Sequence, residues 1–186
     1  MRNILLFIFI LLMLVACKPT VNEKPVVYEG EHADLFSELP DRPEEGGDIF
    51  IVANDGLHNE EIWDAFYEQV KAGQEASLLI GAYTIEGDVI YKLLEYDGSI
   101  FSLNEDNSRD SYASIVPDRI ERTNLYYLEY QSKEEVNGQE KPFMNRYCFL
   151  SDEVYDEEGL NKVFEKFKTG EESGLLMVWG YSGMIR

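Results

Sequence analysis

The sequence predicts an α+β fold in which two helices pack on one face of a mainly antiparallel sheet. Two stretches, 59–73 and 156–170, carry apolar residues at the spacing of a helix. Between them lie runs in which apolar and polar residues alternate, separated by tight-turn dipeptides, as in antiparallel strands. Each helical stretch has one apolar stripe that it cannot bury alone, and an antiparallel sheet has a face to cover.

The N-terminal segment 1–16 has the features of a bacterial lipoprotein signal peptide. Arg2 precedes an apolar run over 4–16, which as a helix would cover about 20 Å, less than the roughly 30 Å hydrocarbon core of a membrane. The run ends in the letters LVAC, which resemble a lipobox, and Cys17 supplies the thiol that accepts a diacylglyceryl group. An ordinary secretory signal followed by a chance cysteine is the alternative.

We therefore expect the mature protein to begin at Cys17 and to be lipid-anchored on the extracytoplasmic side of the bacterial cell membrane. Residues 17–47 form an acidic tether that contains several prolines. The apolar stretch "ADLFSEL" within this tether is expected to make one helical turn or to dock on the domain. The remaining residues, 48–186, suffice for a single α+β domain.

The domain is predicted to begin with a strand, a turn and a helix. The apolar run "DIFIVA", residues 48–53, is typical of a buried strand, and the turn-rich loop "NDGLHN" follows it. Asn59 lies where a helix N-cap is expected, and Lys71 and Gly73 lie where a helix ends. The apolar stripe of this helix consists of Trp63, Phe66, Tyr67 and Val70.

Period-two patterns predict the strands that follow. Residues 77–85, 89–96 and 99–103 are separated by turns that contain Gly87 and Gly98, which favours a three-stranded meander. Residues 124–131 and 143–151 flank a connection with the dipeptide Asn137-Gly138, which predicts a second hairpin. The second helix and a last strand over 175–182 complete the order β, α, β, β, β, β, β, α, β.

The segment 59–80 recurs at 156–177 with the same acidic first turn, apolar stripe, lysine and glycine. Asp156 takes the place of the expected N-cap Asn59, and Phe164 lies on the stripe of the second copy. Two interpretations remain open. One is internal duplication, and the other is independent use of the same capping rules by two helices.

The composition is strongly acidic. The chain has 36 acidic and 16 basic residues and a net charge of −20, which argues against nucleic acid as a partner because the phosphate backbone would be repelled. This surface fits a solvated, soluble domain, or one that recruits divalent cations or a basic protein. We therefore expect membrane contact through the lipid anchor, with an envelope protein or divalent cations as candidate partners.

Two residue types that often carry chemistry are scarce. Cys148 is the only cysteine besides Cys17, and it lies in the apolar run "RYCFLS", which favours a core position over a nucleophile. Asp55 and His58 lie beside the first helix and could act as orienter and general base. A single histidine in a turn is nevertheless more typical of a structural or exposed residue.

One acidic loop alternates its polar residues like the first ligands of an EF-hand, at Asp106, Ser108 and Asp110. The pattern fails at position six, where Ser111 replaces glycine, and at position twelve, where Pro117 replaces glutamate. A nonstandard cation site is one interpretation. The favoured one is a loop in which Arg109 pairs with neighbouring carboxylates.

The tyrosines of the stretch "LYYLEY" are a candidate contact surface. Tyr126, Leu128 and Tyr130 share one strand face, which is either open to a partner or, as we favour, a core face under a helix. The sequence assigns no catalytic residue, no cofactor and no metal-binding residue. Its one assigned site residue is Cys17, for lipid attachment.

Residues 83–112, together with residues 54–73, resemble a family of uncharacterised Gram-positive lipoproteins and secreted proteins that carry a domain of unknown function. The resembling elements are the turn over 83–88, the "YDG" of 96–98 and the acidic loop over 106–110. The resemblance implies a bacterial, surface-exposed protein. It implies no activity, and no catalytic residue is carried over from it.

These features predict a non-enzymatic, lipid-anchored extracytoplasmic domain that binds another envelope component. The alternative is a carboxylate-dependent hydrolase that acts on cell-envelope material. Because the chain has 36 acidic residues, carboxylate pairs arise at almost any spacing by chance, and their pattern does not decide between the two.

Overall fold

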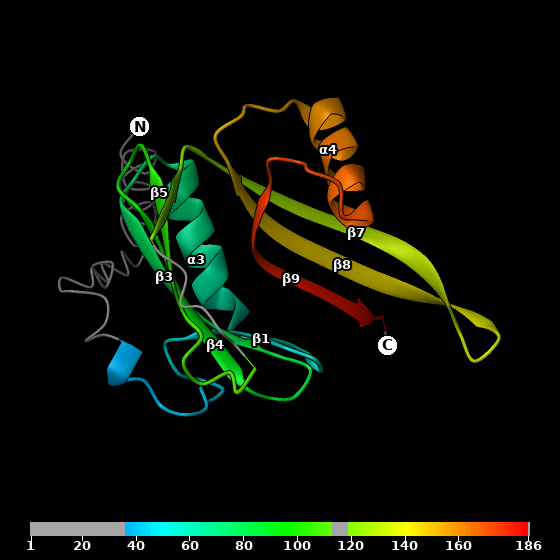
Figure 1. The fold of residues 1–186 in the computed structure, drawn as a ribbon, viewed down its shortest axis with the longest axis horizontal. Helices are drawn as coiled ribbons and strands as arrows, with labels where there is room; N and C mark the ends of the chain where they lie inside the picture. The colour runs from blue at the N-terminus through cyan, green and yellow to red at the C-terminus, as the bar shows by residue number, and fades with distance from the viewer. Residues whose placement is uncertain (1–35, 113–118, 186) are drawn as a thin grey trace, which may run out of the picture.

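The computed structural model of this chain describes residues 36–112 and 119–185. The signal peptide, Cys17 and the first part of the tether lie outside the described residues, as does Pro117. The described part is an α+β structure with two helices, a mixed six-stranded sheet and a three-stranded antiparallel sheet (Figure 1). The predicted α+β class is confirmed.

The six-stranded sheet has the order β2-β1-β3-β4-β5-β6. Its strands are β1 (Phe50–Ala53), β2 (Gly56–His58), β3 (Ala76–Tyr83), β4 (Val89–Tyr96), β5 (Phe101–Asp106) and β6 (Ile120–Arg122). The predicted meander is confirmed, because β3, β4 and β5 pair antiparallel in sequence order. β1 and β3 are parallel, since helix α3 (Glu60–Lys71) carries the chain back before β3 begins.

The three-stranded sheet consists of β7 (Asn124–Val136), β8 (Gln139–Ser151) and β9 (Leu176–Met184). The predicted hairpin of β7 and β8 turns at Asn137 and Gly138, whose φ angles are 54° and 75°. Positive φ at both positions is what a two-residue hairpin turn requires. Both strands continue past the end of β9, so the hairpin tip projects from the molecule (Figure 1).

Helix α3 lies between the two sheets (Figure 1). Trp63 is at the centre of the main core, where its ring contacts five other aromatic rings at centroid distances of 4.9 to 6.1 Å. These rings belong to Phe50, Phe66, Tyr67, Tyr127 and Trp179. Cys148 and Leu150 of β8 belong to the same buried cluster, so the three-stranded sheet closes the core on the side of α3.

Helix α4 (Glu157–Thr169) lies on the opposite face of the three-stranded sheet. Its Phe164 packs against Phe149 of β8, with the ring centroids 5.6 Å apart, whereas the next residue, Leu150, faces α3. The prediction that both helices cover one face of one sheet is therefore wrong. The physical reason is that β8 is apolar on both faces, so successive side chains fill two separate layers.

The two copies of the repeated segment differ in topology. The strands that flank α3, β1 and β3, pair parallel, whereas those that flank α4, β8 and β9, pair antiparallel. This difference disfavours duplication of one structural unit. It supports the second interpretation, in which two helices use similar sequences to begin, pack and end.

The helix N-termini differ as well. Asp156 caps α4 as predicted, because its side chain accepts a hydrogen bond from the amide of Gly159 at 2.8 Å. Asn59 occupies the predicted N-cap position of α3, but the prediction that its side chain caps the helix is wrong. The residue has a left-handed φ of 57° and makes no side-chain cap bond. Its amide group instead donates to the carbonyl of Ile49 and accepts from the amide of Gly46, each bond within 2.8 Å.

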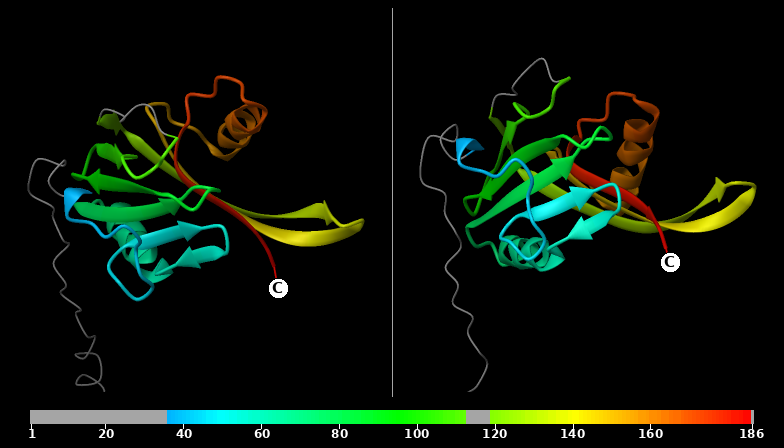
Figure 2. Two further views of the ribbon diagram at one scale, coloured as in Figure 1. Left: turned by 60° about the horizontal axis from the view of Figure 1, so that its bottom comes forward. Right: turned by 90° about the horizontal axis from the view of Figure 1, so that it is seen from below.

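Residues 36–47, which we call the strap, cover the face of the six-stranded sheet opposite α3 (Figure 2). Phe36 and Leu39 pack with side chains of β1, β3 and β4 in a second buried cluster. The predicted docking of the stretch "ADLFSEL" is confirmed for its described residues, 36–39, which also include one helical turn. The strap thus takes part in the domain core, although the sequence pattern places it in the tether.

The strap needs a glycine beneath it. A Cβ atom at Gly81 of β3 would lie 2.9 Å from Cγ of the buried Pro43. We expect Gly81→Ala to push the strap away from the sheet and to cost about 1 to 3 kcal/mol of unfolding free energy, as overpacking does. Chemical denaturation would measure this cost. Gly56→Ala is the matched control, since a Cβ atom there meets nothing closer than 3.9 Å, and equal stability of the two variants would contradict the expectation.

Candidate functional site

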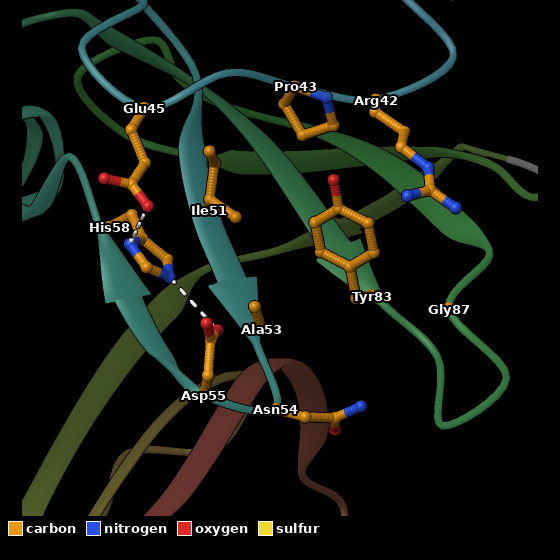
Figure 3. Close-up of a pocket in the computed structure, with 10 residues that line it drawn as sticks. All are labelled: Arg42, Pro43, Glu45, Ile51, Ala53, Asn54, Asp55, His58, Tyr83 and Gly87. Carbon is orange, nitrogen blue, oxygen red and sulfur yellow. Dashed lines mark hydrogen bonds and ion pairs between the residues drawn. The ribbon is translucent and has the colours of Figure 1, made fainter.

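A pocket of about 360 Å³ lies where the strap meets strands β1, β2 and β3 (Figure 3). Ile51 and Ala53 of β1 line its middle. His58 of β2 lies on one side, and Tyr83 of β3 lies on the other. This volume is at the lower end of the range for small-molecule sites, about 300 to 1,000 Å³.

The His58 side of the pocket carries two carboxylates. The ring Nδ1 lies 3.2 Å from a carboxylate oxygen of Glu45 in the strap, and Nε2 lies 3.2 Å from a carboxylate oxygen of Asp55. The sequence predicts that Asp55 lies near His58, and the structure brings them together. It also adds Glu45, which no sequence pattern connected with this histidine.

This arrangement limits the chemistry of His58. A neutral imidazole has one donor and one acceptor nitrogen, so it can donate to only one of the two carboxylates, whereas the imidazolium form donates to both. A general base needs a ring nitrogen whose lone pair is directed at the substrate. Both nitrogens of His58 are directed at carboxylates instead, which suits a link between strap and sheet.

The same geometry argues against a cation held by these three residues. The two ring nitrogens point in different directions, so Glu45 and Asp55 do not converge on one position with the ring. Among the residues that the structure describes, no group of three or more histidine, cysteine, aspartate or glutamate side chains is arranged to hold a metal ion.

The opposite side of the pocket carries a cation. Figure 3 shows the guanidinium of Arg42, from the strap, beside Tyr83 and the turn that contains Gly87. Most lysine and arginine side chains in the described ranges pair with a carboxylate, but Arg42 has no carboxylate partner there.

Two exposed apolar side chains lie in segments that adjoin the pocket lining, one in the turn between Tyr83 and Gly87 and one in a loop bonded to that turn. Ile85 is 86% exposed in the turn that follows Tyr83, and Tyr112 is 80% exposed in the loop that follows β5. The two segments are joined, because the amide of Ser111 donates to a carboxylate oxygen of Asp88 at 3.0 Å. Exposed apolar groups gathered next to a pocket are typical of a contact surface.

The acidic loop after β5 is closed by its own residues. Arg109 donates to one carboxylate oxygen of Asp106 at 2.6 Å, and the amide of Ser108 donates to the other at 3.0 Å. Arg109 also donates to the carbonyls of Phe36 and Leu39 at 2.9 and 3.1 Å. The predicted role of Arg109 is confirmed. Because Asp106 is engaged on both oxygens, the EF-hand-like alternation does not present it to a cation.

Tyr91 supports the strap from β4. Its hydroxyl donates to the carbonyl of Pro40 at 2.8 Å, and the Arg109 guanidinium lies 5.0 Å from the centre of its ring. Burial raises the pKa of Tyr91 from 10.0 to about 12, and the positive charge of Arg109 opposes this shift only in part. The neutral form of Tyr91 is therefore the one that belongs to the folded state.

This shift predicts a pH dependence. Between about pH 10 and about pH 12, Tyr91 gives up its proton in the unfolded chain but keeps it in the folded one. Its contribution to stability is therefore fully present below about pH 10 and is lost as the pH rises towards about 12. We expect Tyr91→Phe to lose stability less steeply over this range in urea titrations. The exposed Tyr112→Phe variant, as control, should follow the wild type, and parallel curves for all three proteins would contradict the expectation.

Two other candidate residues lie in packed regions. Cys148 is fully buried, and burial raises the pKa of its thiol well above the usual range, so the predicted core position is confirmed. The face of Tyr126 and Tyr130 is covered by α4 and the segment that leads to it. Tyr130 packs against Phe164 with ring centroids 6.0 Å apart, and Tyr126 accepts from the amide of Tyr155 at 2.8 Å. The face therefore lies partly under α4, as favoured, but its residues are half-buried and belong to neither of the two buried clusters.

No family model, no curated protein and no solved structure matches this chain. The resemblance to Gram-positive lipoproteins, drawn from the turns and the acidic loop, stays a prediction. So does lipid attachment at Cys17, which lies outside the described residues. Within residues 36–112 and 119–185, no helix has the length and apolar character needed to cross a membrane.

Proposed function

We propose that this chain is a lipid-anchored extracytoplasmic binding protein that recognises another component of the cell envelope at the pocket between the strap and strands β1 to β3. The observation that carries the proposal is the combination of this pocket with the exposed Ile85 and Tyr112, which lie in the turn between two lining residues and in the loop bonded to that turn. Ligand sites are typically concave, apolar in the middle and fitted with a few polar groups that orient the ligand.

The pocket also lies close to the anchor along the chain. Two of its lining residues, Arg42 and Glu45, belong to the strap, which follows the predicted attachment site Cys17. The chain between Cys17 and Phe36 spans at most about 65 Å when fully extended. The tether and the size of the domain together therefore limit how far from the membrane a partner in the pocket can lie, as expected for a component of the envelope.

The charge of the protein restricts the partner further. A net charge of −20 disfavours nucleic acid and anionic lipid head groups as direct ligands of the folded part. Membrane contact is assigned to the lipid anchor alone. An envelope protein or a short peptide present in the envelope is the partner class that we assign to the pocket and its apolar surroundings.

Site-specific photocrosslinking in living cells tests the proposal. A photoreactive phenylalanine analogue is placed at Ile85 or Tyr112, and as control at Glu135, which is exposed near the tip of the β7–β8 hairpin. We expect the same adduct, identified by mass spectrometry, at both positions beside the pocket and not at the hairpin. The adduct should weaken when Arg42→Gln is added. If neither pocket position gives an adduct, the binding site is not here.

The hydrolase alternative predicts a different result. Purified protein would then release products from wall glycans or esters, and Asp55→Asn would abolish this release. Both nitrogens of His58 are directed at carboxylates, which disfavours this alternative for the pocket. Turnover that depends on Asp55 would replace the binding proposal with an enzymatic one.

Lipid anchoring has its own test. We expect Cys17→Ser to leave the precursor unlipidated and to move the protein out of the membrane fraction, because no thiol remains to accept the diacylglyceryl group. Metabolic labelling with a palmitate analogue measures this directly. Cys148→Ser is the matched control and should keep the label, since Cys148 is buried in the core. Label that persisted on the Cys17→Ser protein would exclude Cys17 as the attachment site.

A further inference from the structure

We propose that the pocket binds a short peptide with both termini free, about three residues long, with its carboxylate at Arg42 and its ammonium group at Asp55. The inference rests on the proposed function, because it names the ligand class of the same site. It is carried by the charges at the two ends of the pocket, by their separation and by the apolar surface between them.

The two ends of the pocket carry opposite charge. Arg42 lies at one end without a carboxylate partner among the described residues, and Asp55 and Glu45 flank His58 at the other (Figure 3). The carboxylate of Asp55 is 78% exposed, so it can meet a ligand while it holds His58. A ligand that satisfies both ends must carry a negative group and a positive group on opposite sides.

The separation of the two ends selects the length of this ligand. His58 lies on β2 and Tyr83 on β3, and both strands are neighbours of β1. Adjacent strands lie about 4.8 Å apart, so strands β2 and β3, which bound the floor of the pocket, are about 10 Å apart. An extended peptide covers about 3.3 to 3.6 Å per residue, so three residues span this distance. A single amino acid, with its charged groups on one Cα atom, is too short to reach both ends.

The middle of the pocket selects for small side chains. Ile51 is buried and Ala53 is half-buried, and both lie between the charged ends. Together with the ring of Tyr83, they offer apolar surface to the ligand between its two charged groups. A volume of about 360 Å³ leaves room for a backbone of three residues with side chains about the size of alanine.

Isothermal titration calorimetry with full-length protein in detergent micelles tests this inference. The probe is trialanine with both termini free, and the comparison ligands are N-acetyl-trialanine, trialanine amide and free alanine. Surface charge pairs contribute little individually, so blocking either terminus should weaken binding by about threefold to fivefold. Free alanine should bind at least about tenfold more weakly, because it cannot engage both ends.

Substitutions at Arg42 and Asp55 test which side of the pocket binds each terminus of the peptide. Arg42→Gln should weaken trialanine but leave the affinity for trialanine amide unchanged, since the amide has no carboxylate to lose. Asp55→Asn should weaken trialanine but not its N-acetyl form. Lys166→Gln on α4 and Glu135→Gln on the hairpin are matched charge controls outside the pocket and should behave as the wild type.

The outcomes separate this inference from the proposed function. Equal affinity for the free and the blocked peptides would contradict the proposal of a zwitterionic ligand. Equal effects of the pocket variants and the control variants would contradict it too. Absence of trialanine binding would overturn it as well. In both cases the adduct at Ile85 and Tyr112 decides independently whether the pocket is a binding site. If the crosslink persists without peptide binding, the ligand class is wrong and the site is right.

Discussion

Replacing Trp63 with alanine should reduce the unfolding free energy by about 3 to 5 kcal/mol, the range for a buried large aromatic side chain. Trp63 is 4% exposed and joins both sheets, because its ring contacts Phe50 of β1 and Trp179 of β9. No neighbouring side chain can fill the space without leaving its own position. Since single domains are stable by only about 5 to 15 kcal/mol, the substitution removes a large part of the protein's stability.

Guanidinium denaturation, followed by far-ultraviolet circular dichroism, measures the effect of Trp63→Ala. The matched control is Tyr112→Ala, which removes another aromatic ring but one that is 80% exposed. Its change should stay within about 0.5 kcal/mol of the wild type. A Trp63→Ala protein as stable as this control would mean that the two sheets do not share the core around α3.

Phe164→Ala should have an effect of similar size, about 3 to 5 kcal/mol, but in a different layer. Phe164 is 4% exposed and attaches α4 to the outer face of the three-stranded sheet. Its ring lies 5.2 to 6.4 Å from the ring centroids of Tyr130, Tyr147, Phe149 and Phe167. Without it, α4 loses the side chain on which this aromatic cluster is centred.

Hydrogen exchange and denaturation together test the Phe164 prediction. Amides of α4 should lose protection before those of α3, and Lys162→Ala, on the exposed side of α4, should leave both unchanged. Phe66→Ala, in the main core, should add to Phe164→Ala without coupling, because the two residues lie on opposite sides of the three-stranded sheet. Strong coupling between the two substitutions would show that the layers are not independent.

Helices and hairpins could be predicted from the sequence because their patterns are local. The apolar stripes, the glycine turns and the Asn137-Gly138 dipeptide act within a few residues, and the structure places the elements close to the predicted ranges. The short strands β2 and β6 were not predicted, since three residues are too few for a periodic pattern to emerge. Whether neighbouring strands join one sheet or two depends on long-range packing, which the patterns do not contain.

The candidate site was predictable only in part for the same reason. Asp55 and His58 are three positions apart, so their proximity could be predicted from the sequence. Glu45 and Arg42 lie in a stretch whose proline-rich, acidic composition is typical of a tether, so no pattern placed them at the site. What holds this stretch in place comes from far along the chain, from Tyr91 and Arg109. The prediction for Asn59 fails for a different reason. Asparagine often caps a helix, but this side chain bonds the amide of Gly46 in the strap and the carbonyl of Ile49 instead.

The contact between Phe50 and Trp179 has a consequence for how the chain reaches its folded state. Their ring centroids are 5.2 Å apart, although one residue lies in the first strand and the other in the last. Closing so long a loop costs entropy before the packing that repays it can form, which slows folding. A chain that leaves a translocation channel N-terminus first keeps Phe50 and its neighbours exposed until β9 emerges. If the chain is exported as we propose, the core is completed only after β9 has left the channel, and until then the exposed apolar strands are open to aggregation or to chaperones.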